Sequence, residues 1–206
     1  MQPIALRCTY RYRGYSNAEI ALLKQDLEGV AVLQSRPQGY PEAGNTYDMV
    51  FVAQFVGSSI VGGLIYDGLK EVGKALYRFY KRKTAASPDS FPPEIDLFEL
   101  RFDDLDLRLR GKDRENMECN FLSDAVFEHL ADLVTHIKEH LESEPLLSED
   151  KLLIDVFEPE ITLSETGKPA FNFQHPWRIV GVDVTGPKAY YANERILNED
   201  HISLGY

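Results

Sequence analysis

The chain has 206 residues, of which 44% are hydrophobic and 27% are charged, and its formal net charge is −11. This composition is that of a folded globular protein and excludes a disordered chain. The acidic excess repels a phosphate backbone, so we expect no nucleic-acid ligand and instead a protein partner with a basic surface.

The N-terminal residues predict a strand followed by a helix. Residues 4–13 alternate apolar and basic side chains, as a strand with one buried face does. Residues 16–29 have the pattern of a helix, with Ser16 or Asn17 as its N-cap and Gly29 as its terminator.

A predicted strand over residues 30–35 leads into a segment, 36–48, that is rich in Pro, Gly and Asn. This composition predicts a loop that is longer than a compact connection needs. Long loops often carry function, and tyrosines are enriched among the contact residues of protein interfaces. We therefore predict that Tyr40, Pro41 and Tyr47 bind a partner.

Residues 49–66 contain no charged side chain, which raises the question of a membrane span. A run of this length lies at the lower limit for crossing a bilayer, and the basic residues downstream fit the positive-inside tendency. Gln54, three glycines and a concentration of β-branched residues favour a strand followed by a packed amphipathic helix. We expect that soluble arrangement, and a membrane-associated effector acting through 49–66 is the alternative.

The glycines of this stretch, Gly57, Gly62 and Gly63, stand between the predicted strand and helix, where backbone N–H groups favour anions. Their spacing matches neither the Gly-x-Gly-x-x-Gly pattern nor a phosphate loop that ends in Lys-Ser or Lys-Thr. We expect close packing of the helix on the sheet and no bound nucleotide.

Residues 84–93 contain three prolines and small polar side chains, which predict the end of the helix and a linker. The predicted organisation is an N-terminal subdomain over 1–86, a linker over 87–93 and a C-terminal subdomain over 94–206. A single continuous domain is the alternative.

The second half predicts more strands and one further helix. Residues 94–111 alternate over two strands with a turn at Asp103 and Asp104, and 123–141 carry an apolar stripe at helical spacing. Other strands are expected over 116–121, 151–163, 170–174 and 178–184. The predicted fold is α+β, with mixed or antiparallel sheets, two main amphipathic helices and one N-terminal helix.

One pattern on the second main helix has a catalytic interpretation. His136, Glu139 and His140 form His-x-x-Glu-His, which resembles the inverted zinc motif of insulinase-like peptidases. That resemblance implies zinc on both imidazoles and Glu139 activating water, so a zinc-dependent hydrolase is an alternative function. The polar residues around the motif also fit a solvated helix face, and we expect no metal and no other cofactor.

The remaining candidates are the cysteines and the single tryptophan. Cys8 and Cys119 are isolated in predicted strands, which favours a reducing compartment and a cytoplasmic protein. The N-terminus contains no apolar region of signal-peptide length, so we expect no export. Trp177 follows a proline and is predicted to anchor either the core or a partner interface.

The stretches "LKQDLEGVAVLQSRP" and "VGSSIVGGLIYDGLKEVGKAL" make the N-terminal half similar to small effector-associated domains of bacterial conflict systems. The resemblance covers about half of the chain and transfers no individual site residue. Those domains are adaptors, so the resemblance implies a non-catalytic interaction module, such as an immunity-type or effector-associated component.

Overall fold

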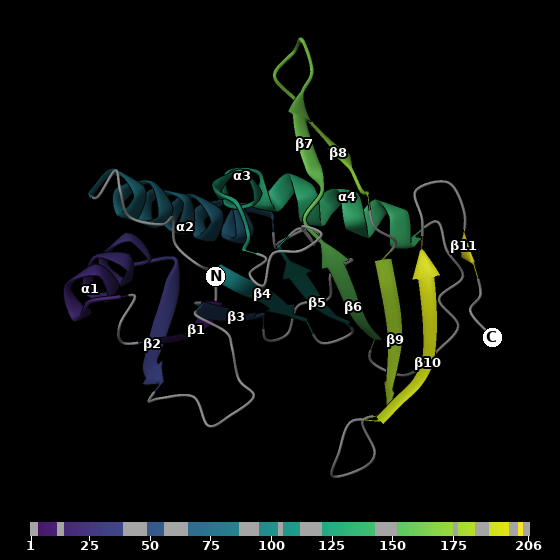
Figure 1. The fold of residues 1–206 in the computed structure, drawn as a ribbon, viewed down its shortest axis with the longest axis horizontal. Helices are drawn as coiled ribbons and strands as arrows, with labels where there is room; N and C mark the ends of the chain where they lie inside the picture. Colours follow the sequence, from purple (N-terminus) through teal and green to yellow (C-terminus); the bar gives the residue numbers. More distant parts are fainter. Residues whose placement is uncertain are drawn as a thin grey trace.

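The computed structural model has an α+β fold, as the sequence predicts (Figure 1). It describes residues 4–11, 15–38, 49–55, 66–86, 95–102, 105–111, 121–142, 152–174, 177–183, 190–197 and 202–203. The helices are α1 (Asn17–Asp26), α2 (Tyr66–Ala86), α3 (Asp124–Glu128) and α4 (Leu130–Glu142). The strands are β1 (Ile4–Arg11), β2 (Ala31–Gln38), β3 (Met49–Gln54), β4 (Ile95–Arg101), β5 (Leu105–Arg110), β6 (Leu152–Phe157), β7 (Glu160–Leu163), β8 (Pro169–Asn172), β9 (Trp177–Asp183), β10 (Tyr190–Leu197) and β11 (Ile202–Ser203).

Within the described residues, nine strands form one mixed sheet in the order β11-β10-β9-β6-β5-β4-β3-β1-β2. The pairs β1/β2, β3/β4 and β5/β6 are parallel, and each pair is joined by a connection that contains a helix. Parallel neighbours require such long crossovers, whereas the other neighbouring strands are antiparallel. Figure 1 shows α2, α3 and α4 along one face of this sheet.

The core runs as a row of side chains across the sheet on the face that the helices cover. Side chains along a strand point alternately to the two faces of the sheet, so each neighbouring strand contributes one buried residue to this row. The row consists of Cys8, Phe51, Phe98, Leu109 and Val156, which are register partners on β1, β3, β4, β5 and β6. All five are buried, so the sheet and its helices share one hydrophobic core.

Burial in this row controls the chemistry of Cys8, which is a free thiol. Loss of hydration raises the pKa of Cys8 to about 12, so the thiol stays protonated near neutral pH. Because the thiolate is the reactive form, we expect native protein to resist alkylation at pH 8 and to react fully in guanidinium. A Cys119→Ser variant isolates this thiol in an iodoacetamide time course. Rapid labelling of the native variant would contradict the buried placement.

Ser16 is the N-cap of α1. Of the two residues predicted for this role, Ser16 and Asn17, the first is therefore correct. The Ser16 hydroxyl accepts a hydrogen bond from the Glu19 N–H at 3.2 Å, and the Glu19 carboxylate accepts one from the Ser16 N–H at 2.7 Å. This reciprocal pair is a capping box. Gly29 follows the helix with φ of +80°, a conformation that glycine adopts at little cost.

The uncharged stretch 49–66 contains a strand, as predicted. β3 occupies its first six residues, and α2 begins at Tyr66, the last residue of the stretch. Positions 56–65, including the three glycines, lie outside the described residues. Among the helices of the described chain, none combines the length and apolar composition that a bilayer crossing requires.

The basic residues near the end of α2 pair with carboxylates of neighbouring helices. Arg78 and Arg82 pair with Asp26, Lys83 pairs with Glu19, and Lys81 pairs with Asp124. These pairs link α2 to α1 and α3. The basic run therefore has a structural role in joining these helices.

One predicted boundary near these elements is wrong, because β2 continues through residues 36–38, which the sequence assigned to the loop. α2 continues through 84–86, the start of the Pro-rich tract, and ends at Ala86, directly before the predicted linker over 87–93. The proline in β2 is tolerated because this strand lies at the edge of the sheet. Beyond the predicted linker, β4 pairs directly with β3, so the sheet continues from one predicted subdomain into the other.

The second half follows the prediction with three differences. The predicted helix over 123–141 is divided at His129 into α3 and α4, although His129 still hydrogen-bonds to Ala125 and Leu133. The predicted strand over 151–163 is divided into β6 and β7. β10 and β11 were not predicted. Residues 116–120 lie outside the described chain.

Candidate protein-binding site

A β-hairpin made of β7 and β8 projects from the body of the molecule (Figure 1). It is a separate two-stranded sheet and does not extend the main one. Leu163, at the end of β7, is 61% exposed, which is the highest value among the large exposed hydrophobic side chains of the described residues. The hairpin therefore presents an apolar side chain to solvent at a distance from the core.

The tip of the hairpin, Ser164–Lys168, is ordered by its own hydrogen bonds. The Ser164 N–H donates to the Lys168 carbonyl at 2.9 Å, and the Gly167 N–H donates to the Ser164 carbonyl at 2.9 Å. The Lys168 N–H also donates to the Ser164 hydroxyl at 3.0 Å. Gly167 has φ of +76°, which a tight turn requires and which glycine adopts easily. The tip thus has a defined shape.

An aromatic cluster holds the base of the hairpin against α4. The rings of Phe171 and Phe173 lie 5.5 and 5.8 Å from the imidazole of His136. Trp177 contacts Phe173 at 4.7 Å and the imidazole of His140 at 5.1 Å, both edge to face. Aromatic pairs of this kind contribute about 0.5–1.5 kcal/mol each beyond burial. Since an isolated hairpin is marginally stable in water, this cluster gives it the support it needs.

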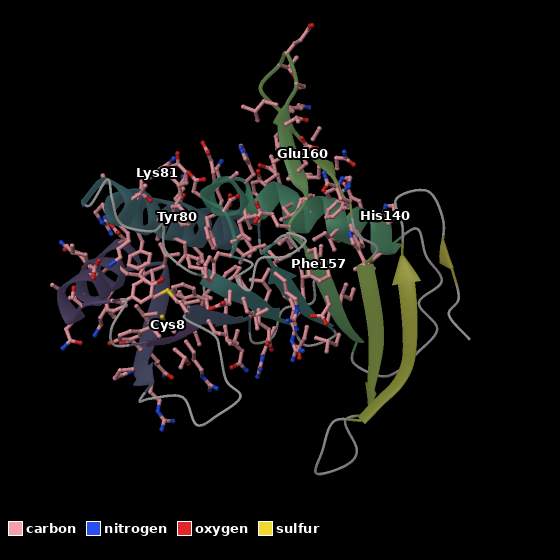
Figure 2. All side chains as sticks on the ribbon, viewed as in Figure 1. Cys8, Tyr80, Lys81, His140, Phe157 and Glu160 are labelled. Atoms are coloured by element: carbon pink, nitrogen blue, oxygen red, sulfur yellow. The ribbon has the colours of Figure 1, made fainter. Side chains whose placement is uncertain are left out.

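Glu158 fixes the point where the hairpin leaves the main sheet. Its carboxylate is buried and accepts hydrogen bonds from the Ser123 N–H at 2.9 Å and from the Ser123 hydroxyl at 2.5 Å. Its backbone N–H donates to the carbonyl of Arg110 at 2.7 Å. The residue therefore ties the hairpin base to both β5 and the N-terminus of α3. Glu160, which is labelled in Figure 2, begins β7 two residues later.

The predicted zinc motif lies inside this aromatic cluster. His136 and His140 are half-buried with ring centroids 6.4 Å apart, and Glu139 is exposed. The sequence places both histidines on a solvated helix face; they remain partly exposed there, and aromatic side chains that follow in the sequence pack against them. In the described part of the chain, no group of three His, Cys, Asp or Glu side chains is placed to hold a metal. The two imidazoles act here as aromatic packing surfaces.

The predicted partner-binding residues have different outcomes. Tyr40, Pro41 and Tyr47 lie outside the described residues, so their role stays a prediction. Trp177 is 3% exposed and belongs to the core, which is one of the two roles predicted for it. The sequence contained a signal for the hairpin that was missed: Pro159 interrupts the strand pattern, and Ser164–Lys168 is a turn sequence.

The opposite face of the sheet carries charged side chains that pair with one another. Glu99 accepts hydrogen bonds from the Nε groups of Arg101 at 2.5 Å and Arg108 at 3.3 Å. Arg110 donates to Asp155 at 3.2 Å. This cross-strand ladder stabilises the sheet and requires no ligand to explain it.

No protein-family model, no curated protein and no solved structure matches this chain.

Proposed function

We propose that the chain is a non-catalytic, cytoplasmic protein-binding module and that the β7–β8 hairpin is its recognition element. The main support is the placement of Leu163, which is 61% exposed on an ordered, projecting hairpin. An immunity-type or effector-associated component is the class of protein that such a module suits. The cytoplasmic location is supported by the free thiol of Cys8.

Preorganisation explains how a small hairpin binds effectively. Association costs free energy when loops and side chains must be ordered in the complex. The internal hydrogen bonds of Ser164–Lys168 and the aromatic support of Phe171 and Phe173 reduce that cost before a partner arrives. An apolar residue surrounded by polar side chains also has the general anatomy of an interface, in which a polar rim surrounds an apolar contact.

The charges around the hairpin favour a partner with a basic surface. Glu139, Glu160 and Glu165 are exposed on or beside it, and Lys168 is the basic side chain at its tip. The whole chain carries a net charge of −11, which adds long-range attraction for a basic protein. Binding through this surface is expected to weaken as salt concentration rises, because salt screens exposed charges.

The test uses one variant in the hairpin and one matched control. Leu163→Lys replaces the exposed apolar side chain with a charge that a basic partner repels. Leu22→Lys makes the same change at a leucine on α1 that is 47% exposed. Tagged wild type and both variants are incubated with an extract of the source cells, and retained proteins are quantified by mass spectrometry. We expect a protein that wild type and Leu22→Lys retain equally and that Leu163→Lys retains at least about tenfold less.

Equal retention of every captured protein by Leu163→Lys and wild type would contradict the proposed role of the hairpin. Both variants are first compared with wild type by circular dichroism melting. Both leucines are exposed, so neither substitution is expected to unfold the chain.

A further inference from the structure

Three neighbouring strands, β2, β1 and β3, carry a patch of side chains on the face of the sheet that points away from the core. Alternation along the strands directs Cys8 and its register partner Phe51 into the core and the residues on either side of them to the opposite face. The strand pairings arrange nine such residues in three rows. The rows are Gln54, Ala5 and Val32; Val52, Arg7 and Gln34; and Val50, Thr9 and Arg36. All nine are exposed or half-buried, and we call them the acid-free patch because none is Asp or Glu.

The charge of the acid-free patch is opposite to that of the whole chain. The chain has 33 acidic residues and 22 lysines and arginines, whereas the patch has two arginines and no acidic residue. Arg7 lies at its centre, and the register partners of Arg7 are the uncharged Gln34 and Val52. The patch is therefore a positively charged area on a negatively charged molecule.

Arg7 and Arg36 also differ from the other arginines of the structure. The five others whose side chains the structure describes each pair with a carboxylate; they are Arg78, Arg82, Arg101, Arg108 and Arg110. In the same part of the chain, the side chains of Arg7 and Arg36 make no ion pair and no hydrogen bond. Their guanidinium groups are free to bind a ligand.

The acidic residue next to the patch does not neutralise Arg7. It is Glu99, the register partner of Val52 on β4. Glu99 is 4% exposed, and its two carboxylate oxygens accept hydrogen bonds from Arg101 and Arg108. Arg7 is therefore left without a counter-charge along its row of the sheet.

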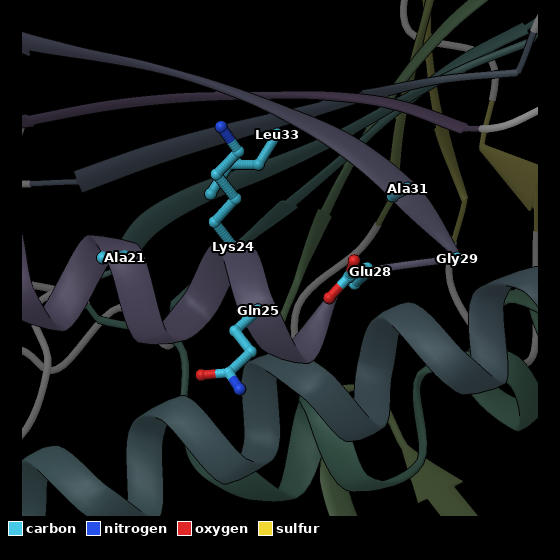
Figure 3. A pocket seen from close by; sticks show the side chains of 7 residues that line it. All are labelled: Ala21, Lys24, Gln25, Glu28, Gly29, Ala31 and Leu33. Carbon is cyan, nitrogen blue, oxygen red and sulfur yellow. The ribbon is translucent and has the colours of Figure 1, made fainter.

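The opposite side of β2 carries a surface of a different kind. An open cleft of about 400 Å³ lies there between α1 and β2 (Figure 3). It is lined by Ala21, Lys24, Gln25, Glu28, Gly29, Ala31 and Leu33. The single lysine and the single glutamate balance each other, so this cleft has no net charge. The preference for an acidic ligand belongs to the acid-free patch alone among these two surfaces.

We propose that the acid-free patch binds an acidic segment of a partner protein. A guanidinium group binds a carboxylate with two parallel hydrogen bonds. Arg7 and Arg36 are diagonal neighbours on adjacent strands, which sets their Cα atoms roughly 8 Å apart. Acidic residues at i and i+2 of a strand, or at i and i+4 of a helix, have a similar separation. The valines of the patch supply apolar contact that excludes water and strengthens both ion pairs.

Other anionic occupants fit this patch less well. Single-stranded nucleic acid binds through aromatic side chains that stack on its bases, and none of the nine residues is aromatic. Anionic membranes are bound by clusters of about four to eight lysines and arginines, whereas the patch has two. A second copy on a two-fold axis would set the Arg7 side chains of both copies beside each other and would join two chains of net charge −11.

The test starts from a random peptide library displayed on phage. The library is selected on the wild-type chain and counter-selected on Arg7→Glu/Arg36→Glu, and the most enriched peptide is synthesised with a fluorescent label. We expect this peptide to carry two acidic residues among apolar ones. Arg7→Glu and Arg36→Glu are each expected to weaken its binding at least about tenfold, measured by fluorescence anisotropy. Lys24→Glu is the matched control, because it makes the same change of charge on α1, and it is expected to bind as wild type does.

Charge exchange separates this proposal from its rivals. A peptide with lysines in place of its acidic residues is expected to bind Arg7→Glu/Arg36→Glu and not the wild type. Leu163→Lys is expected to bind the acidic peptide as wild type does, because the hairpin lies on a different part of the fold and the two proposals are independent. Circular dichroism spectra that match wild type establish that the variants fold.

Three results would overturn the proposal. One is a selection that enriches no acidic peptide. Another is an equal loss of binding in Lys24→Glu and Arg7→Glu, because net charge alone would then explain it. The third is tighter binding of a thymidine oligonucleotide or of phosphatidylserine vesicles than of the peptide, with loss in Arg7→Glu, which would assign the patch to a different anion.

Discussion

Replacing Gly73 with alanine is expected to lower the free energy of unfolding by about 2 kcal/mol. This glycine lies in α2 where the helix passes α3 and α4. A Cβ atom at this position would lie 2.5 Å from the carbonyl oxygen of Phe127 and 3.1 Å from the Cβ of Leu130. The first of these atoms is backbone, so relief requires the helices to move apart. Alanine's better helix propensity, about 1 kcal/mol, offsets only part of that cost.

Gly68→Ala is the matched control, one and a half turns earlier in the same helix. Its new Cβ would meet the Cδ1 of Ile4 at 3.0 Å, which is the end of a flexible side chain. The gain in helix propensity is expected to balance this contact, which leaves stability within about 0.5 kcal/mol of wild type. Urea unfolding followed by circular dichroism measures both variants. Equal stability of the two would show that α2 and α3 do not approach as closely as described.

Local sequence signals predicted the elements whose residues interact with near neighbours in the chain. The alternation on either side of Asp103 and Asp104 predicted β4 and β5, and Ser16 marked the start of α1. Such signals are strong because a period of two or a capping box arises within one short segment. The α+β class follows from them.

Local sequence patterns could not predict which distant segments pair with each other. β3 lies between β1 and β4, and the N–H of Met49 donates to the carboxylate of Asp96, a contact between residues 47 positions apart. No periodicity within either strand indicates that contact. β10 was missed for a related reason, since residues 190–197 mix Asn, Glu and Arg among apolar residues and show no clear alternation.

The candidate site shows the same limit. A helical projection of residues 123–141 separates polar from apolar positions, and it predicted that His136 and His140 face solvent. It contains no information about Phe173 and Trp177, which come later in the chain and pack against the two imidazoles, leaving each half-buried. The projecting hairpin was missed because residues 151–163 were treated as a single strand, although Pro159 interrupts them.

The largest loss of stability is expected for Phe98→Ala, at about 4 kcal/mol. Phe98 is fully buried in the middle of the core row, on β4 near the centre of the sheet. Its ring lies 6.4 Å from Phe51 and 6.0 Å from Phe127, edge to face with both. It therefore connects the sheet to α3. Truncation to alanine loses the free energy gained by burying the ring and loses both aromatic contacts. It also leaves a cavity in the core.

Phe98→Leu is the matched control, because leucine keeps most of the buried volume but loses the ring contacts. Its expected cost is about 1–1.5 kcal/mol. Domains are typically stable by about 5–15 kcal/mol, so the alanine variant is expected to lose a large part of the total and the leucine variant a small part. Urea unfolding measures the difference as a shift of the midpoint concentration, provided that the slope of the unfolding free energy against urea concentration stays constant. If both variants lost the same small amount, Phe98 would not join the sheet to α3, and the arrangement of the helices on this face would be wrong.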